Sequence, residues 1–494
     1  MLEAKAKTGA LPDGLDPLAL YLRLTGGRRD TMLFERRGAA SLLLAGAAVR
    51  LVCRGRTVVA TAIGEEGPKA LAALAEALPD ALVERSCDVA LFEFPPIEAV
   101  QPAERLTAPS PFDALRALTA GAGDAPAEPF ALAALGVIAF DHVDLLEELP
   151  ANKEDPLGFP DLLIWLAEDL VVIEADGRAR AVCASLGDEA AAERRLEKLV
   201  ESCATLPPLA RPNSPGEADF GQVDLDDEAY EDVVRGMKEH ILTGDVYQIV
   251  ASRTFRAPCP DPAASFAAQR HCDPSPYQFY VSAPDHVLFG CSPETSVRVD
   301  ADGEVEIKPI AGTRPRGATI DEDDRLEAEL RLDEKEVAEH MMLVDLARND
   351  VARVSVPGTR RVARLLDVER YARVMHLVSS VTGRLRRGYD AVHALQACLN
   401  VGTLSGAPKL RAIELLRQTE RTKRGPYGGA VGWMNSAGAL DTGVIIRSAV
   451  VKDGIAFVRA GAGIVHDSDP AAESDETKRK ASSILSVLAG QPAS

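Results

Sequence analysis

One segment rich in residues that interrupt regular structure divides the chain and constrains how it can fold. Residues 206–224 read LPPLARPNSPGEADFGQVD, with many prolines and glycines and few large apolar side chains. Such a composition favours a connecting segment over a helix or a strand. In a chain of 494 residues we therefore expect an N-terminal region at 15–205, a linker at 206–224 and a C-terminal region at 225–490.

The overall composition excludes several classes of protein. Hydrophobic residues make up 46% of the chain and charged residues 26%, as is typical of a folded globular protein. No uninterrupted apolar run reaches about 18 residues, and the first residues lack the apolar core of a signal peptide. We therefore expect a cytoplasmic protein with no membrane-spanning helix.

The net charge and the cysteine content limit which binding partners and metal or redox chemistry are expected. The net charge of −20 at pH 7 disfavours nonspecific binding to nucleic acid or to an acidic membrane. It leaves a small anionic substrate open, because a local pocket can oppose the global field. The eight cysteines contain no CxxC pair for zinc or redox chemistry, and each is expected to be a small buried residue.

Hydrophobic periodicity predicts both helices and strands on each side of the linker, without the βαβ rhythm of a parallel sheet. The elements expected before the linker are a helix at Pro68–Leu78 and strands at Ser41–Leu44, Val49–Cys53, Val58–Ala62 and Leu170–Glu174. Those expected after it include a helix from an Asp226 or Asp227 cap to Leu242 and strands at Val246–Phe255, Ala430–Asn435, Thr442–Val451 and Ile455–Ala460. The pattern predicts an α+β fold.

Two acidic helices carry carboxylates three residues apart, which places each pair on one helix face. The first is expected at about Asp333–Asp350, with Glu336 and Glu339, and the second starts near Asp469 and carries Glu473 and Glu476. Magnesium needs few protein carboxylates, so four acids on two helices are sufficient to hold it. The same spacing is common on solvated helix faces, and the spacing alone leaves both interpretations open.

Glycine-rich turns and nearby cations form the second candidate group. Turns at Pro309–Gly317, Gly402–Lys409 and Ala460–Gly463 can bring backbone N–H groups against an anion, or can be turns and nothing more. Arg447 lies within an apolar stretch predicted to be a strand, where it either reaches the sheet edge or pairs with an anion. Together these features fit a small molecule with two carboxylates, one on magnesium and one on Arg447.

His376 has apolar neighbours on both sides in the sequence YARVMHLV. It is either a core histidine with one hydrogen bond or a general acid or base. The chain has no GxSxG elbow and no paired Cys and His setting of a nucleophilic enzyme.

These motifs occur together, in order, in one known family. The stretches are GDVYQIVASRTF, DPSPYQFY, GCSPE, PIAGTRPRG, DEKEVAEHMMLVDLARNDVARV, VERYARVMHLV, GTLSGAPK, RGPYGGAVG and residues 459–476. The chain resembles the chorismate-utilising enzymes, and among them the large subunits of anthranilate synthase. The resemblance covers nearly all of residues 225–490 and extends more weakly over 15–200. It implies a two-sheet β-sandwich core flanked by helices.

The resemblance assigns roles residue by residue. Glu339 and Glu476 match the magnesium ligands, with Glu336 and Glu473 as partners through water, while Glu294, His376 and Thr403 match residues at or near the reacting ring. The positions that match substrate contacts are Gly312, Thr313, Tyr427, Arg447, Gly461, Ala462 and Gly463, with Lys409 as an anion-binding lysine.

The implied reaction adds ammonia to C2 of chorismate with loss of the C4 hydroxyl, and then removes the C2 proton and pyruvate to give anthranilate. Glu294 is the expected acid for the hydroxyl and His376 the expected helper in the elimination. Relatives that make isochorismate carry a lysine at the place of Gln248, and relatives that make 4-amino-4-deoxychorismate often carry a nucleophilic lysine at the place of Ala311. Glutamine and alanine cannot take those roles.

Partners and alternatives follow from the same resemblance. The family takes ammonia from glutamine through an amidotransferase, and no such segment is recognisable here, so we expect a separate amidotransferase subunit in a hetero-oligomer. The family's tryptophan feedback site uses Leu-Leu-Glu-Ser and Pro-Tyr-Met segments. The corresponding residues here are Glu35 and Arg36 in one segment and Pro276, Tyr277 and Gln278 in the other.

The changes to Arg36 and Gln278 are expected to alter or abolish tryptophan inhibition. Two enzymatic alternatives stay open at this point. One is a 2-amino-2-deoxyisochorismate synthase that releases the intermediate, and the other is a feedback-relaxed anthranilate synthase of specialised metabolism. A non-catalytic relative is expected to have lost the magnesium acids or His376, and this chain keeps all of them.

Overall fold

The computed structural model describes residues 4–99, 101–120, 128–204, 214–371 and 374–490. Its helices are α1 Pro17–Thr25, α2 Gly67–Ala77, α3 Pro102–Arg105, α4 Phe112–Ala120, α5 Glu189–Cys203, α6 Asp227–Leu242, α7 Pro262–Cys272, α8 Ile320–Leu332, α9 Glu334–Val354, α10 Ala391–Cys398, α11 Lys409–Thr419 and α12 Pro470–Ala489, with short 3-10 turns η1 Phe140–Leu145 and η2 Gly402–Leu404. In the described part of the chain, every helix is too short or too polar to span a lipid bilayer.

The strands form one hydrogen-bonded network. They are β1 Ala4–Leu11, β2 Thr31–Arg36, β3 Ser41–Arg54, β4 Thr57–Ala62, β5 Leu82–Arg85, β6 Val89–Glu93, β7 Ala134–Ile138, β8 Leu162–Ile173, β9 Ala179–Leu186, β10 Gln248–Pro258, β11 Tyr277–Ser282, β12 Val287–Ser292, β13 Thr295–Val299, β14 Glu304–Ile307, β15 Ile310–Pro315, β16 Arg361–Arg370, β17 Val374–Arg384, β18 Gly406–Ala407, β19 Ala430–Met434, β20 Leu440–Val444, β21 Ser448–Lys452 and β22 Ile455–Ile464.

Two runs of antiparallel strands start from the long pair β3 and β8. The first arm leaves β3 through β2, β11, β12, β21, β22 and β10. The second arm leaves β8 through β7, β19, β20, β13, β14 and β17. Antiparallel strands with one buried face must place that face against a second layer.

The two arms enclose a common core. Phe279 of β11 and Leu288 of β12 belong to the same buried cluster as Trp165 of β8 and Val431 of β19. The hydroxyl of Tyr277 on the first arm donates to the Asp441 carboxylate of the second arm, with an oxygen–oxygen distance of 2.8 Å. The predicted α+β fold, with sheets packed face to face and helices outside them, is confirmed.

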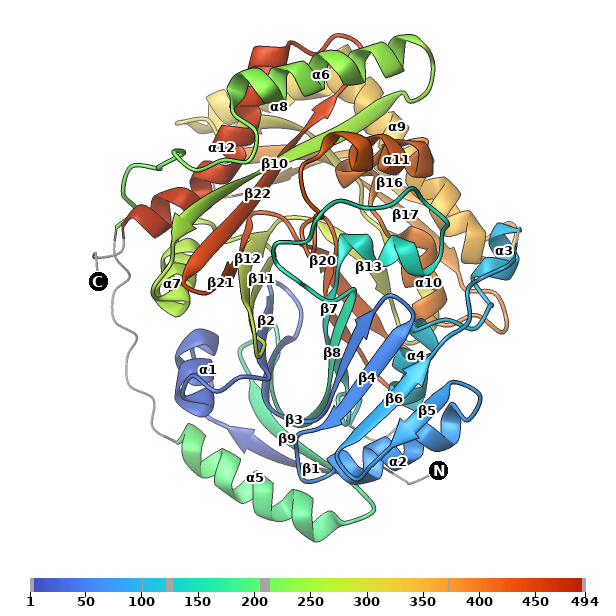
Figure 1. Ribbon diagram of the computed structural model, residues 1–494. Coiled ribbons are helices and arrows are strands. Elements are labelled where there is room, and N and C mark those ends of the chain that lie inside the picture. Colours follow the sequence, from blue (N-terminus) through green and yellow to red (C-terminus); the bar gives the residue numbers. More distant parts are fainter. Residues whose placement is uncertain (1–3, 100, 121–127, 205–213, 372–373, 491–494) are drawn as a thin grey trace.

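Helices cover the outer surfaces of both arms (Figure 1). α6 and α12 pack on β10 and β22 at one end, α9 packs on β15 and β17, and α5 covers β1 and β9 at the opposite end. Aspartate N-caps fix where α6, α9 and α12 begin. Asp226, Asp333 and Asp469 each accept hydrogen bonds from backbone N–H groups of the first turn.

Most of the expected elements occur where the sequence predicts them. Two predictions differ from the structure. The strands expected at Ser41–Leu44 and Val49–Cys53 are one strand, β3, whose pairing with β8 shifts register between Leu44 and Val49. The strand expected at Thr442–Val451 is two strands, β20 and β21, because Arg447 between them has a left-handed backbone with φ of 47°. The chain turns there from one arm of the sandwich to the other.

The division at 206–224 stays a prediction, and residues 206–213 of it lie outside the described residues. In space, strands from both sides of the linker pair with one another. β2 pairs with β11 and β7 pairs with β19. The N-terminal region therefore contributes strands to the same two arms as the C-terminal region.

Candidate active site

A buried carboxyl group lies at the junction of β12 and β13. Glu294 is only 7% exposed, and its carboxylate oxygen accepts a hydrogen bond of 2.6 Å from the Thr403 hydroxyl of η2. Burial raises the pKa of Glu294 to about 7, against the lowering effects of Thr403, Lys480 and Arg447. At neutral pH this side chain is therefore divided between its acid and carboxylate forms, as a proton donor requires.

A neutral imidazole faces the same region from β17. The Nδ1 atom of His376 lies 3.1 Å from the Gly312 carbonyl and 3.0 Å from the Thr313 hydroxyl. Because a carbonyl oxygen only accepts, the bond to Gly312 requires the proton on Nδ1. Nε2 is then a buried lone pair with no hydrogen-bond partner among the described residues. Burial lowers the pKa of His376 to about 4, which keeps it neutral at pH 7.

A bulge in β15 places this histidine. The register between β15 and β17 shifts between Ala311 and Thr313, and Gly312 at the bulge has φ of 77°. A Cβ on Gly312 would lie 3.2 Å from a methyl group of Leu377 in a backbone conformation that only glycine adopts readily. The glycine is thus required by the turn that brings its carbonyl to His376.

Arg447 supplies a cation close to both groups. Its charge lowers the pKa of Glu294 and of His376, so its guanidinium lies within the field of each. The left-handed backbone at Arg447 lets its carbonyl accept a hydrogen bond of 2.8 Å from the side chain of Gln269. Its only acidic contact among the described residues is with Asp273, at 3.4 Å. Arg447 is therefore held by its backbone and only weakly by a carboxylate.

Small residues of β22 let a buried phenol lie close to the strand. A Cβ on Gly461 would lie 3.2 Å from the Tyr427 hydroxyl, and one on Gly463 would lie 3.0 Å from the Gln248 amide nitrogen. Ala462 between them is fully buried. Burial raises the pKa of Tyr427 to about 12, so its hydroxyl remains a donor at neutral pH. Side chains larger than hydrogen at the two glycines would press against these neighbouring groups.

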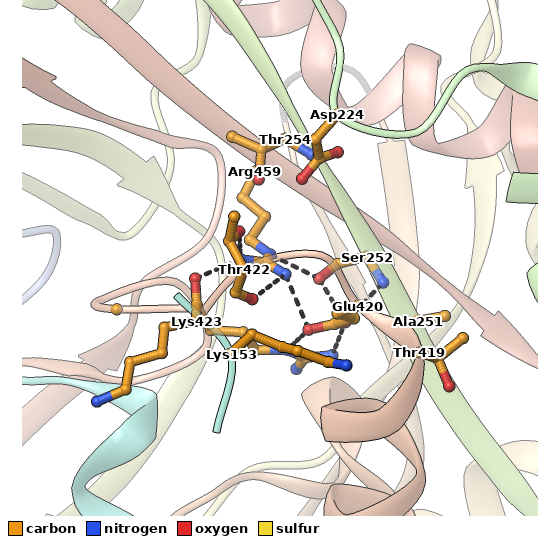
Figure 2. Close-up of polar contacts among 12 residues, drawn as sticks. Lys153, Asp224, Ala251, Ser252, Thr254, Thr419, Glu420, Thr422, Lys423 and Arg459 are labelled. Atoms are coloured by element: carbon orange, nitrogen blue, oxygen red, sulfur yellow. Dashed lines mark hydrogen bonds and ion pairs between the residues drawn. The ribbon is translucent and has the colours of Figure 1, made fainter. Parts of the chain in front are cut away.

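The sequence did not reveal a buried network of charges around Glu420, which joins β10, β22 and the loop after α11 (Figure 2). The Glu420 carboxylate accepts hydrogen bonds from Ser252, Arg424 and Arg459, and all four side chains are buried. Arg424 and Arg459 fall in stretches that resemble the family, while Glu420 has no neighbouring pattern that marks it as buried. Only the tertiary structure reveals that one carboxylate serves two guanidiniums.

Lys409, expected to bind an anion, is engaged elsewhere. Its ammonium lies 2.8 Å from the buried Asp350 carboxylate and 3.3 Å from the Cys398 carbonyl. Its contacts are with α9 and the end of α10, whereas Glu294 and Thr403 contact each other. The anion that Lys409 meets in this structure is a side chain of the protein itself.

The four acidic candidates for a metal site face one another from α9 and α12. Burial raises the pKa of Glu339, and the charges of Glu336, Glu473 and Glu476 raise it further. The carboxylate of Glu476 lies 2.7 Å from the Lys480 ammonium, and the carboxylate of Glu336 lies 3.0 Å from the Arg314 guanidinium.

Among the described residues, no three His, Cys, Asp or Glu side chains are grouped to hold a metal as they stand. A magnesium ion needs only one or two protein carboxylates and fills its other positions with water or substrate oxygens. Oxygen donors that repel one another across two helices fit that requirement. Lys480, which also donates to the Gly461 carbonyl at 2.9 Å, was not among the expected site residues.

The residues expected at an effector site are occupied by internal contacts. Both carboxylate oxygens of Glu35 accept from Arg270, at 2.7 and 2.8 Å. The Arg36 guanidinium lies 4.3 Å from the centre of the Tyr277 ring and 3.5 Å from the Asp441 carboxylate. The remaining two expected residues also make hydrogen bonds. The Gln278 side-chain amide donates to the Asp273 carbonyl, and the Pro276 carbonyl accepts from the Arg37 N–H.

We expect Glu294 to titrate near pH 7 in the folded protein, because burial disfavours its carboxylate. Carbon-13 NMR of protein labelled at the glutamate carboxyl carbons should show one such midpoint, which Glu294→Gln removes. Thr403→Val removes a donor that stabilises the carboxylate, so the midpoint should move to higher pH. If the resonance that Glu294→Gln removes titrates near pH 4 in the wild type, the assignment is wrong.

The comparisons with known proteins agree with this geometry. Residues 91–486 match the chorismate binding enzyme family. Anthranilate synthase component 1 of Vibrio cholerae serotype O1 is 43% identical over 97% of this chain and 95% of that protein. The pyocyanine-specific anthranilate synthase component 1 of Pseudomonas aeruginosa is 44% identical over 96% of this chain and 93% of that protein.

A solved structure extends the likeness to three dimensions. Anthranilate synthase component I from Streptococcus pneumoniae aligns with a TM-score of 0.71 at 27% identity, covering 97% of this chain and 100% of that one. The family expected from the sequence motifs is thereby confirmed. The chain belongs to the chorismate binding enzyme family, among the anthranilate synthase component 1 proteins.

Proposed function

We propose that this chain is the large subunit of an anthranilate synthase, which converts chorismate and ammonia to anthranilate, pyruvate and water. The observation that carries the proposal is the pairing of a buried acid, Glu294, with a neutral base, His376, beside the cation Arg447. Anthranilate synthesis needs one group to give a proton and another to take one. The relatives named above support the same reaction.

Glu294 acts in the first step. Ammonia attacks C2 of chorismate, the ring double bond shifts, and the C4 hydroxyl leaves as water with the proton from Glu294. The Thr403 hydroxyl donates to Glu294 and orients the carboxyl group while it loses that proton. Since a general acid works in its protonated form, the rate of this step should fall as pH rises through about 7.

His376 acts in the second step. Its unprotonated Nε2 accepts the C2 proton of the aminated intermediate, while Nδ1 stays bonded to the Gly312 carbonyl. The electron pair of the broken C–H bond enters the ring, the bond from C3 to the enolpyruvyl oxygen breaks, and pyruvate leaves. The Gly312 carbonyl stabilises the imidazolium that forms, in the way an acceptor at the second nitrogen supports any histidine base.

The substrate carboxylates require donors on two sides. Arg447 offers a guanidinium, the Tyr427 hydroxyl is a donor at neutral pH, and the absence of side chains at Gly461 and Gly463, on either side of Ala462, lets neighbouring groups lie close to β22. Gly312 and Thr313 belong to the same site through their contacts with His376. We propose that these residues bind and orient chorismate.

Two side chains favour ammonia over water or an enzyme nucleophile. Gln248 is a neutral amide next to Gly463, so it cannot deprotonate water. Ala311 on β15 has no nucleophilic atom and cannot form a covalent intermediate. Both features support amination at C2 in the reaction of this chain.

We propose magnesium as the metal, held by Glu339 and Glu476 with Glu336 and Glu473 behind them. The proposal is supported by the mutual repulsion of these oxygens and by their position on facing helices. A bound magnesium ion supplies a positive charge that neutralises and orients a substrate carboxylate. Lys480 and Arg314 then have to exchange their contacts with Glu476 and Glu336 for others.

We propose a separate glutamine amidotransferase subunit as the source of ammonia, within a hetero-oligomer, and the cytoplasm as the compartment. The names of the relatives, component 1, support the first point. All eight cysteines are free, seven of them buried or half-buried, which is typical of a reducing compartment and supports the second.

The purified chain, given chorismate, an ammonium salt and magnesium, should form fluorescent anthranilate and an equal amount of pyruvate. Glutamine should not replace ammonia in the absence of a partner subunit. Glu294→Gln keeps the shape and the contact with Thr403 but cannot donate the proton, so kcat should fall about 10²- to 10⁴-fold. His376→Ala should slow pyruvate release and let the aminated intermediate accumulate.

Three outcomes would contradict parts of this proposal. Formation of the aminated intermediate without pyruvate by the wild type would favour the 2-amino-2-deoxyisochorismate synthase. Use of glutamine by the chain alone would remove the need for the partner. Unchanged turnover in Glu294→Gln would remove its role as the acid.

Chelation by EDTA should abolish anthranilate formation, and magnesium should restore it. Calorimetry should show magnesium binding that weakens about 10-fold or more in Glu339→Gln and in Glu476→Gln. The matched control is Asp345→Asn, which removes an exposed carboxylate from the same helix α9 and should leave binding unchanged. Equal weakening by the control would point to a general effect of helix charge.

We propose that tryptophan does not inhibit this enzyme, because the Arg36 guanidinium occupies the surface of Tyr277 and pairs with Asp441. Activity should be unchanged at about 1 mM tryptophan. Arg36→Ser combined with Gln278→Met should introduce inhibition, while Arg37→Ser, at an exposed neighbouring position, should not. Strong inhibition of the wild type at micromolar tryptophan would refute the proposal.

A further inference from the structure

The buried network of Figure 2 connects the segments that carry the candidate site residues. Glu420 follows α11, Arg424 precedes Tyr427, and Arg459 lies on β22 two residues before Gly461. Arg459 donates to the Ser252 hydroxyl of β10 at 2.8 Å and to the Lys423 carbonyl at 2.6 Å. The network therefore joins β10, β22 and the loop between α11 and β19 at one point.

Arg424 makes the contact that reaches furthest toward the site. Nε and one terminal nitrogen bind the Glu420 carboxylate, at 2.9 and 2.6 Å, and that terminal nitrogen also donates to the Val250 carbonyl at 2.6 Å. The other terminal nitrogen donates to the carbonyl of Leu404, the residue directly after Thr403. A planar guanidinium serves these acceptors at once, which a lysine ammonium on a flexible stem cannot do.

The segment that Arg424 holds is itself tightly wound. The Ser405 hydroxyl donates to the Val401 carbonyl at 2.9 Å, and the Ser405 carbonyl accepts from the Val250 N–H at 3.0 Å. Thr403 lies inside this turn, and its hydroxyl points at Glu294. With the ends of the turn fixed, the backbone at Thr403 and Leu404 has little freedom, and the bond from Arg424 to the Leu404 carbonyl restricts it further.

We propose that Arg424 is a positioning residue of the reaction, which fixes the Leu404 carbonyl and thereby aims the Thr403 hydroxyl at the Glu294 carboxyl. This inference rests on the proposed function, because its readout is the reaction of Glu294. A purely structural role for the network is the alternative. It predicts a loss of stability in variants, with no change in how the activity depends on pH.

Four neighbouring groups act on Glu294, and the experiment has to separate them. The Thr403 hydroxyl donates to it, the cations Lys480 and Arg447 lower its pKa, and the phenol of Tyr371 lies within its field. Arg424 touches none of these groups directly, and its shortest route to them is the Leu404 carbonyl, next to Thr403. A longer route runs through Glu420, Arg459 and β22 to Lys480. The double variant with Thr403→Val separates the two routes, because only the first depends on the Thr403 hydroxyl.

The test is the pH profile of kcat with chorismate, ammonia and magnesium. In the wild type, activity should decline as pH rises through about 7, and this limb should disappear in Glu294→Gln. Arg424→Lys keeps the positive charge beside Glu420 but loses the planar, forked guanidinium. The alkaline limb of its pH profile should therefore move up by about half a pH unit, as in Thr403→Val. The KM for chorismate should change less than about twofold, and the double variant should show no further shift.

Arg417→Lys is the matched control. Arg417 is a buried arginine of α11 whose guanidinium binds Asp144 and the Pro150 carbonyl, away from Thr403. It should lower the melting temperature without moving the limb. If Arg424→Lys does not fold, Glu420→Gln is the second variant, because it loosens Arg424 from the other side and should shift the limb in the same direction.

The outcomes are distinguishable. A limb that stays in place in Arg424→Lys or in Glu420→Gln, or that moves equally in Arg417→Lys, overturns the inference and leaves the proposed function intact. A wild-type limb that survives in Glu294→Gln also overturns it, because the limb then belongs to another group. A wild-type chain that makes no anthranilate from chorismate and ammonia refutes the proposed function instead.

Discussion

The chemistry proposed for this protein depends on a single carboxyl group that the fold removes from water and leaves with one neutral hydrogen-bond donor. Burial of Glu294 disfavours its charged form, and the Thr403 hydroxyl, at 2.6 Å, opposes that effect only in part. Full pairing with an arginine would have made Glu294 a permanent carboxylate. Complete isolation would have kept its proton bound. The balance between the two gives a proton donor at neutral pH.

The two-arm sandwich explains how such a site is built from distant segments. Glu294 lies between β12 of the first arm and β13 of the second, and the Val444 N–H of β20 donates to its backbone carbonyl at 2.9 Å. The break at Arg447 lies at the neighbouring crossing between β20 and β21. The same irregular junction therefore positions the acid and the cation, and a regular strand at either place would have turned one of them away.

Helix ends and turn chemistry were predictable from the sequence because they depend on neighbours in the chain. Asp226 caps the helix it was expected to cap, and the helix expected to start near Asp469 is capped by that residue. The two strands around Arg447 were not separable, since the apolar run continues through a left-handed residue that only the tertiary structure demands. For the same reason Lys409 was assigned to an external anion, while the fold supplies the buried Asp350 as its partner.

The acidic candidates show how far spacing alone can lead. Spacing of three residues correctly placed Glu336 with Glu339 and Glu473 with Glu476, but it could not reveal that the two helices face each other. Lys480 lies four residues after Glu476 on the same helix, so that contact follows from the sequence spacing. The contact between Arg314 of β15 and Glu336 of α9 does not, because it depends on how the two elements pack.

The buried charges around Glu420 call for a reason beyond stability. Removing an ion pair from water costs free energy that the pairing itself regains only in part, and apolar side chains of similar volume often serve a core as well or better. One carboxylate between two guanidiniums is a costly choice for a core. What apolar residues cannot provide is direction. Hydrogen bonds to the Leu404, Val250 and Lys423 carbonyls fix peptide planes, and the first of these carbonyls comes directly after Thr403, the donor to Glu294.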